Sequence, residues 1–160
     1  MSKISLAIIG CGARGAGVYA KLAKEVYADR VKVVAIADID SERLELTRRL
    51  CGVDPTLCFP SGEALLEKGK LADAVVIATM DRDHVDFAIK ALDLGYDILL
   101  EKPISPLLEE CLALKEKYEA DPHHVVVCHV LRYNSFYGTL KRIIDSGKLG
   151  EVVNVEASEN

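Results

Sequence analysis

Hydrophobic and polar positions along the chain follow two alternating periods, which predicts strands separated by helices. Short apolar runs rich in β-branched residues occur at "KISLAIIG" and "VKVVAIAD", as expected of strands. Between them, residues 14–29 carry an apolar stripe at Val18, Leu22 and Val26, and this spacing is typical of a helix. The first third of the chain is therefore predicted to form a strand–helix–strand unit.

The same alternation continues towards the carboxyl end. Further strands are predicted within "ADAVVIAT", "YDILL" and "HVVVCHVL", and a short apolar piece lies near Leu57. Further helices are predicted at residues 41–50, 61–67, 83–94 and 105–119, with Ser41 as an N-cap and Gly95 as a left-handed C-cap. Strands that alternate with helices in this way predict a parallel sheet with helices on both faces, which is a doubly wound α/β fold.

The last part of the chain is predicted to belong to a different unit. "NSFYGTLKRIIDSGKLG" is expected to be a helix that ends at Gly147 or Gly150, and "EVVNVEASEN" a strand without a partner. We therefore expect a dinucleotide-binding domain over residues 1–132, followed by the first helix and strand of an incomplete second domain over residues 133–160. The unpaired edge at residues 152–156 is a site at which a second copy could pair.

The hexamer "GCGARG" at residues 10–15 matches the GxGxxG pattern of dinucleotide-binding folds. It follows a predicted strand and opens a predicted helix, as that pattern requires. Gly10 would form the tight turn, Gly12 would let a pyrophosphate approach the backbone, and Gly15 would allow close packing of helix on strand. The helix start would then offer amides and its dipole to the phosphates. The alternative is a glycine-rich turn that only packs.

An acidic residue, Asp38, ends the second predicted strand. In a Rossmann fold this carboxylate accepts hydrogen bonds from the adenosine ribose, and it repels a 2′-phosphate, so NAD is expected in preference to NADP. Arg14, beside the turn, would either contact the pyrophosphate or lie in solvent.

Two further loops follow later predicted strands. In "TMDRDH", Thr79 and Asp81 are expected over the cofactor cleft, with Asp81 or Asp83 capping the next helix. His84 lies in the first turn, where the helix dipole disfavours an imidazolium, so it is either a structural hydrogen-bonding group or a proton carrier.

In "EKP", alternation along an extended strand sends Glu101 and Lys102 to opposite sides. A lysine near a bound nicotinamide and shielded from water would have a lowered pKa, which suits proton transfer to or from a substrate hydroxyl. The alternative for Lys102 is a solvated charge at the end of a strand.

Composition limits the partners that the chain can have. Half of its residues are hydrophobic and 28% are charged, and the net charge of −5 argues against nucleic acid. The five cysteines are scattered and contain no CxxC pair, so buried thiols in a reducing compartment are expected rather than disulfides or a metal site. No apolar run reaches the roughly 18 residues of a spanning helix. We expect a cytoplasmic protein that binds neither membrane nor nucleic acid.

The ordered set "GCGARG", "AD", "TMDRDH", "EKP" and "RYNSFYGTLKRIIDSGKLGEV" resembles the Gfo/Idh/MocA family, the group of glucose–fructose oxidoreductase and inositol dehydrogenase. The resemblance implies an amino-terminal Rossmann domain for NAD or NADP, and an EKP lysine between nicotinamide and substrate. It also implies a carboxyl-terminal α/β domain that supplies the substrate pocket and usually much of an oligomer interface. A sugar, cyclitol or polyol substrate and a homo-oligomeric full-length protein follow from it.

Carried over residue by residue, the resemblance makes Lys102 the catalytic lysine and Glu101 an acid close to the cofactor. Arg132 matches the start of the crossing into the second domain. Met80 and Asp81 depart from the proline and asparagine that the family usually has in its TPN loop. The full set of expected cofactor-binding residues is Gly10, Cys11, Gly12, Ala13, Arg14, Gly15, Asp38, Thr79, Met80, Asp81, His84, Glu101, Lys102 and Arg132.

The resemblance also implies what this chain would lack. The family's other catalytic residue, typically a histidine with a nearby acid, would lie after residue 160. We therefore expect the chain to bind NAD and to turn over nothing alone, as part of an oxidoreductase that transfers hydride between nicotinamide and a hydroxyl-bearing carbon. An NAD-dependent glycosidase of the same family and a non-catalytic NAD-binding regulatory module are the alternatives.

Overall fold

The computed structural model describes residues 2–120 and 122–158. The chain divides into two compact units, the first ending at Cys128 and the second beginning at His129. Each unit has its own arrangement of elements. The domain boundary predicted between residues 132 and 133 stays a prediction.

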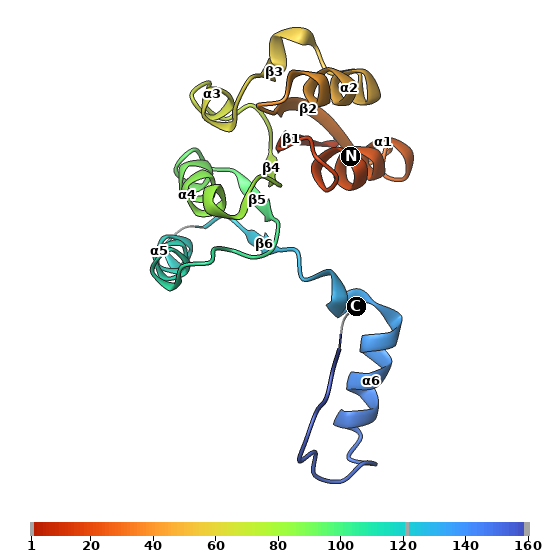
Figure 1. Ribbon diagram of the computed structural model, residues 1–160. Coiled ribbons are helices and arrows are strands. Elements are labelled where there is room, and N and C mark those ends of the chain that lie inside the picture. Colours follow the sequence, from red (N-terminus) through yellow and green to blue (C-terminus); the bar gives the residue numbers. More distant parts are fainter. Residues whose placement is uncertain (1, 121, 159–160) are drawn as a thin grey trace. The chain divides into compact units, whose positions relative to one another are not determined.

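The first unit is built on a six-stranded sheet in the order β3-β2-β1-β4-β5-β6 (Figure 1). Its strands are β1 (Ile4–Ile9), β2 (Val31–Ala37), β3 (Cys58–Phe59), β4 (Ala74–Ile77), β5 (Asp97–Leu100) and β6 (Val125–Val127). Every neighbouring pair is parallel. This is the strand order of a Rossmann fold, with the order reversing between β1 and β4, so the predicted fold class is confirmed.

Helices cover both faces of this sheet. They are α1 (Lys21–Glu25), α2 (Ser41–Cys51), α3 (Gly62–Leu66), α4 (His84–Asp93) and α5 (Leu108–Glu119). The other helical segments are the π-helix η1 (Gly15–Ala20) and two 3₁₀ turns, η2 (Pro55–Leu57) and η3 (Asp81–Asp83). Figure 1 shows α1 and α2 on one side of the sheet and α3, α4 and α5 on the other.

Successive residues of the central strands enter two separate apolar cores. Ile9 and Ile77 belong to the core under α3, α4 and α5, whereas Ile8 and Val76 belong to the core under α1 and α2. Because both sides of each strand are buried, these strands are continuously apolar rather than alternating, as is usual in parallel sheets.

The first predicted helix is shorter than expected, and its predicted apolar stripe is wrong. Helix α1 ends at Glu25, and the side chains of Leu22 and Val26 are exposed. Ala20 and Ala23 are buried instead. Small side chains let this segment lie close to the sheet, so the helix face that packs is the one with the smaller residues.

Two predicted helix caps are also wrong. Asp40, rather than Ser41, caps α2, because its side chain accepts hydrogen bonds from the amides of Glu42 and Arg43. Neither Asp81 nor Asp83 provides a side-chain cap for α4. Asp83 has helical backbone angles because η3 runs directly into α4, so it lacks the extended geometry that a capping side chain needs.

The second unit contains η4 (Val130–Tyr133) and α6 (Ser135–Asp145), which the side chain of Asn134 caps. The strand predicted over "EVVNVEASEN" is not formed within residues 152–158, and the last two residues of that segment lie outside the described part. A strand needs a ladder partner, and the described residues of this unit include no other strand that could pair with it.

The five cysteines are free thiols, as predicted, but only Cys11 and Cys128 are buried. Within residues 2–120 and 122–158, no group of three or more His, Cys, Asp or Glu side chains is placed to hold a metal ion. None of the described helices is long and apolar enough to cross a membrane.

Candidate functional site

Three sequence motifs that are far apart along the chain meet at the carboxyl edge of the sheet. They follow β1, β4 and β5, which are neighbours in the order β1-β4-β5. The amide of Ala78 donates to the carbonyl of Ile9 at 2.8 Å, and the amide of Glu101 donates to that of Ile77 at 2.9 Å. The edge lies where the strand order reverses, which is where open α/β sheets bind ligands.

The glycine loop closes against its neighbours so tightly that two of its positions exclude a side chain. Gly10 has a φ of +93°, and a Cβ there would lie 2.4 Å from the carbonyl oxygen of Ala78. A Cβ on Gly15 would lie 1.7 Å from the carbonyl oxygen of Gly10. Gly10 therefore makes the turn and Gly15 the close packing of helix on strand, as the motif predicts.

Gly12, by contrast, faces open space. The nearest atom to a Cβ placed there is Nη1 of Arg43, at 3.9 Å. A backbone that is bare at this point lets a phosphate approach closely, and the π-helix that begins at Gly15 follows directly. The loop therefore fits the pyrophosphate of a dinucleotide.

Asp38 lies directly after β2 and is buried. Its Oδ2 accepts the amide of Cys11 at 2.5 Å, and its Oδ1 accepts the amide of Asp40 at 2.7 Å. Each carboxylate oxygen can accept more than one hydrogen bond, so Asp38 retains acceptor capacity for ribose hydroxyls. The two bonds fix the carboxylate against the glycine loop.

Cys11 contributes to this arrangement through its backbone. Burial, with the charge of Asp38 as a lesser cause, raises the pKa of the Cys11 thiol to about 12 despite a hydrogen bond with Thr47. The side chain therefore stays a neutral thiol, and its Sγ lies 3.7 Å from the carbonyl oxygen of Ala37. Ala13, another variable position of the loop, is exposed.

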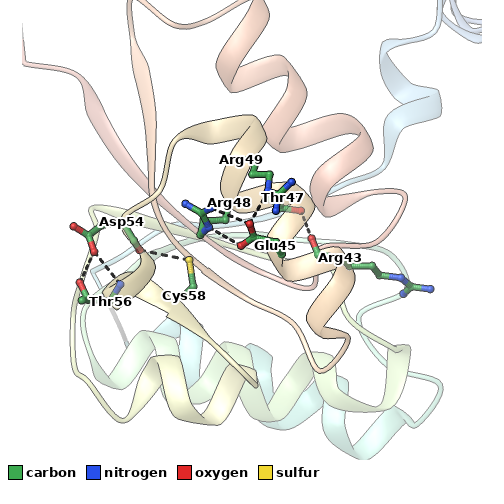
Figure 2. A network of polar contacts seen from close by, with 8 residues as sticks. All are labelled: Arg43, Glu45, Thr47, Arg48, Arg49, Asp54, Thr56 and Cys58. Carbon is green, nitrogen blue, oxygen red and sulfur yellow. Dashed lines mark hydrogen bonds and ion pairs between the residues drawn. The ribbon is translucent and has the colours of Figure 1, made fainter.

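Arg43 is a cation beside the glycine loop that the sequence motifs did not single out. In Figure 2 its guanidinium points away from the cluster in which Arg48 and Arg49 converge on Glu45. Its Nε lies 3.4 Å from Oδ2 of Asp40, and Nη1 borders the open side of Gly12. In the sequence, Arg43 is only one of the three arginines of α2, and no motif distinguishes it from the other two.

The loop after β4 is more open to solvent than the glycine loop. Met80 is exposed, Thr79 is half-buried, and Asp81 is exposed in η3. The Thr79 hydroxyl reaches the carbonyl of Met80 only at 3.5 Å. All three residues lie at the expected edge, with side chains accessible to a ligand.

His84 is buried at the start of α4. Its Nδ1 lies 2.7 Å from the carbonyl oxygen of Pro103, so Nδ1 carries the proton and donates it. Its Nε2 is buried and has no hydrogen-bond partner among the described residues. Of the two roles left open by the sequence, the geometry favours the structural one: His84 ties α4 to the residue after Lys102.

Glu101 and Lys102, which alternation predicts on opposite sides, differ sharply in their exposure to solvent. Glu101 is 4% exposed, whereas Lys102 is exposed to solvent at the carboxyl edge. The peptide bond between Lys102 and Pro103 is cis. The amide of Lys102 donates to Oε2 of Glu101 at 3.2 Å, so the buried acid also holds the backbone of the exposed base.

Arg14 and Tyr19 both reach Glu101 from the segment after the glycine loop. Nε of Arg14 donates to Oε1 of Glu101 at 2.7 Å, and the hydroxyl of Tyr19 donates to the same oxygen at 2.5 Å. Burial by itself would raise the pKa of Glu101, but the hydrogen bonds from Tyr19 and Arg14 outweigh it and lower that pKa. Arg14 is thus neither a free surface charge nor wholly available to a phosphate.

Tyr19 was missed by sequence reasoning because an unusual helix puts it in place. In η1 the amide of Tyr19 donates to the carbonyl of Arg14, five residues earlier, at 3.1 Å. That wider turn brings the phenol beside the guanidinium, with Nη2 of Arg14 3.3 Å from the Tyr19 oxygen. A period of 3.6 residues would not align these two side chains.

Arg132 lies in η4 of the second unit and is exposed. The other thirteen predicted cofactor-binding residues lie in the loops, strand ends and helix starts of the first unit. Their roles towards a cofactor stay predictions.

Comparison with known proteins assigns a family to this arrangement. Residues 4–129 match the family model for Gfo/Idh/MocA proteins, described as an oxidoreductase family with an NAD-binding Rossmann fold. An inositol 2-dehydrogenase of Ralstonia nicotianae is 28% identical over 148 residues, which are 92% of this chain and 43% of that protein. A second inositol 2-dehydrogenase, from Saccharopolyspora erythraea, is 30% identical over 151 residues, which are 94% of this chain and 43% of that protein.

Solved structures agree with the fold. The WlbA dehydrogenase of Bordetella pertussis, in complex with NADH and UDP-GlcNAcA, superposes with a TM-score of 0.83 at 27% identity, over 94% of this chain and 45% of that one. The myo-inositol 2-dehydrogenase of Lactobacillus plantarum gives the same TM-score, 0.83, at 24% identity, over 95% of this chain and 44% of that one. The chain thus spans less than half the length of the relatives that it matches.

Proposed function

The chain belongs to the Gfo/Idh/MocA family of oxidoreductases, and we propose that it is the NAD-binding part of a dehydrogenase that acts on a sugar, cyclitol or related polyol. The observation that carries the proposal is the set of residues gathered at the carboxyl edge of the sheet. An open glycine backbone and a fixed Asp38 lie on one side of the switch point, and the Glu101–Lys102 pair lies on the other. The inositol 2-dehydrogenases among the relatives support the substrate class.

The adenosine half of the cofactor would be bound by Asp38 and the glycine loop. The carboxylate is held in place by two backbone amides, so it is already oriented to accept from ribose hydroxyls. Its negative charge would repel a 2′-phosphate, which supports NAD over NADP. Gly12 and the amides that follow it would receive the pyrophosphate, and Arg43 borders the same opening.

Bound NAD would supply the hydride acceptor. Lys102 would take up or release the proton of the substrate hydroxyl at its Nζ, since it is the exposed base at the carboxyl end of β5. Glu101 lies on the buried side and holds the amide of Lys102, so it would orient the lysine rather than exchange protons with the substrate.

The remaining parts of the proposal concern the whole protein. We infer that residues 133–160 begin a second domain that completes the substrate site and contributes to a homo-oligomer. The relatives extend well beyond the matched region, which supports this reading. Five free thiols support a reducing compartment, the cytoplasm.

The proposal predicts that the purified chain binds NAD but does not reduce it with myo-inositol or glucose. Lys102→Ala should keep NAD binding, because the lysine acts on the substrate; Lys21→Ala, an exposed lysine in α1, is the matched control. NADH formation by the chain alone that disappears in Lys102→Ala would show that the second half is not needed. Absence of NAD binding would remove the proposal altogether.

A further inference from the structure

Tyr19 lies outside every cofactor motif, yet it contacts the ends of two strands. Its hydroxyl oxygen is 2.5 Å from Oε1 of Glu101, which follows β5, and 2.8 Å from Sγ of Cys128, which follows β6. It also lies under the guanidinium of Arg14, whose Cζ is 5.5 Å from the centre of the ring. One side chain of η1 thereby joins the glycine loop to the far half of the sheet edge.

The hydrogen atoms of this cluster can be assigned from its chemistry. A phenol carries one hydrogen, and a carboxylate is a stronger acceptor than a thiol, so the Tyr19 hydroxyl donates to Glu101. Burial raises the pKa of the Cys128 thiol, which therefore stays neutral and can donate weakly to the phenol oxygen. Burial likewise raises the pKa of Tyr19, so the phenol keeps its proton.

The two oxygens of Glu101 have different partners. Oε1 accepts from the side chains of Arg14 and Tyr19, and Oε2 accepts from the backbone amide of Lys102. The carboxylate is thus fixed from one side and holds the lysine from the other. Any rotation of the carboxylate about its own bond would break both sets of contacts together.

We propose that Tyr19 is a positioning residue for Lys102: by donating to Oε1 of Glu101 it fixes the carboxylate whose second oxygen holds the lysine's own amide. This inference rests on the proposed function in one respect, the role assigned to Lys102. The contact itself, and its effect on the Glu101–Lys102 turn, exist without a bound cofactor. Tyr19 therefore acts through Glu101 and does not need to touch the substrate.

Tyr19→Phe tests this directly, because it removes the donor and keeps the ring. In the labelled 160-residue chain, NMR would follow hydrogen exchange at the Lys102 amide. Loss of one hydrogen bond to a charged group should release the carboxylate and speed that exchange by about tenfold. Exchange at the buried Val76 amide of β4 should not change. Tyr118→Phe, which removes the hydroxyl of a partly exposed tyrosine in α5, should change neither amide.

A pH titration of the same amide separates positioning from general loosening. The charged and titratable groups facing Glu101 are Arg14, Tyr19 and Cys128, and of these only the Tyr19 contact changes in the variant. The NMR signal of the Lys102 amide changes with pH as Glu101 ionises. The midpoint of that change should therefore move to higher pH in Tyr19→Phe. Arg14→Gln, which removes the other donor to Oε1, should move it in the same direction.

An unchanged exchange rate and midpoint in Tyr19→Phe would overturn the inference. Faster exchange at Lys102 and Val76 alike, with an unchanged midpoint, would also overturn it, because a general loss of stability would then explain the effect. Neither readout requires NAD. A failure of NAD binding in a separate titration would therefore count against the proposed function alone.

Discussion

Nδ1 of the buried His84 lies 2.7 Å from the carbonyl oxygen of Pro103, and this bond joins the start of α4 to the turn that carries Lys102. The other ring nitrogen, Nε2, is buried without a partner among the described residues. The same side chain therefore contributes one favourable contact and one unfavourable burial. Replacing His84 removes both at once, so the net change in the free energy of unfolding should be small.

We expect His84→Phe to change the free energy of unfolding by less than about 1 kcal/mol. The variant loses one hydrogen bond, worth about 1 kcal/mol, but it also removes an unpaired buried nitrogen, whose cost is of similar size. Urea unfolding of the chain measures the difference. Leu92→Ala, a buried residue of the same helix, is the control and should cost about 2–5 kcal/mol. A cost for His84→Phe as large as that of the control would contradict the assignment.

Gly15→Ala should destabilise the fold by at least about 2 kcal/mol and abolish NAD binding. The new methyl group would lie 1.7 Å from the carbonyl oxygen of Gly10, so the loop or the helix must move. Gly17→Ala is the matched control in the same π-helix, because nothing lies within 4 Å of a Cβ there. It should be neutral or stabilising by up to about 1 kcal/mol. Equal thermal melting of the two variants would show that Gly15 does not make the close contact.

The two arginines that contact Glu45 should lower the pKa of its carboxyl group measurably (Figure 2). Hydrogen bonds from Arg48 and Arg49 lower the pKa of Glu45 to about 2. A lowered pKa means that this contribution to stability is complete above the ordinary glutamate pKa of about 4.3 and is lost as the pH falls towards 2.

Carboxyl NMR of Glu45 gives the midpoint, and Arg48→Gln should move it upward. Because the pair is exposed, high salt should move it in the same direction. A midpoint near 4 in the unaltered chain at low salt would mean that the arginines do not converge on Glu45 in solution.

The glycine loop and Asp38 could be predicted from sequence because the features that define them are local. Backbone geometry requires glycine at positions 10 and 15, and the acid expected to recognise the ribose follows the second strand of the same strand–helix–strand unit. The alternation of strands and helices was sufficient for the fold class for the same reason. Sequence reasoning was least reliable where a neighbour in space, rather than in sequence, decides the outcome.

Tyr19 and Arg43 are the clearest examples. Tyr19 reaches Glu101 only because η1 forms hydrogen bonds five residues apart, and a local pattern of apolar positions does not indicate this. Arg43 lies beside Gly12 because α2, which Asp40 caps, places its first turn near the glycine loop. The predicted strand near the end of the chain failed for a related reason: its β-branched residues favour a strand, but the described part of the second unit offers no partner.

The most direct test of the account is a calorimetric titration of the chain with NAD and NADP, before and after Asp38→Asn. The unaltered chain should bind NAD more tightly than NADP, because the Asp38 carboxylate accepts from ribose hydroxyls and repels a 2′-phosphate. Asp38→Asn keeps the shape but loses the charge, so NAD should bind about tenfold more weakly and the preference over NADP should shrink. Equal binding of both cofactors by the unaltered chain, or an unchanged preference in the variant, would contradict the assignment of this edge as the NAD site.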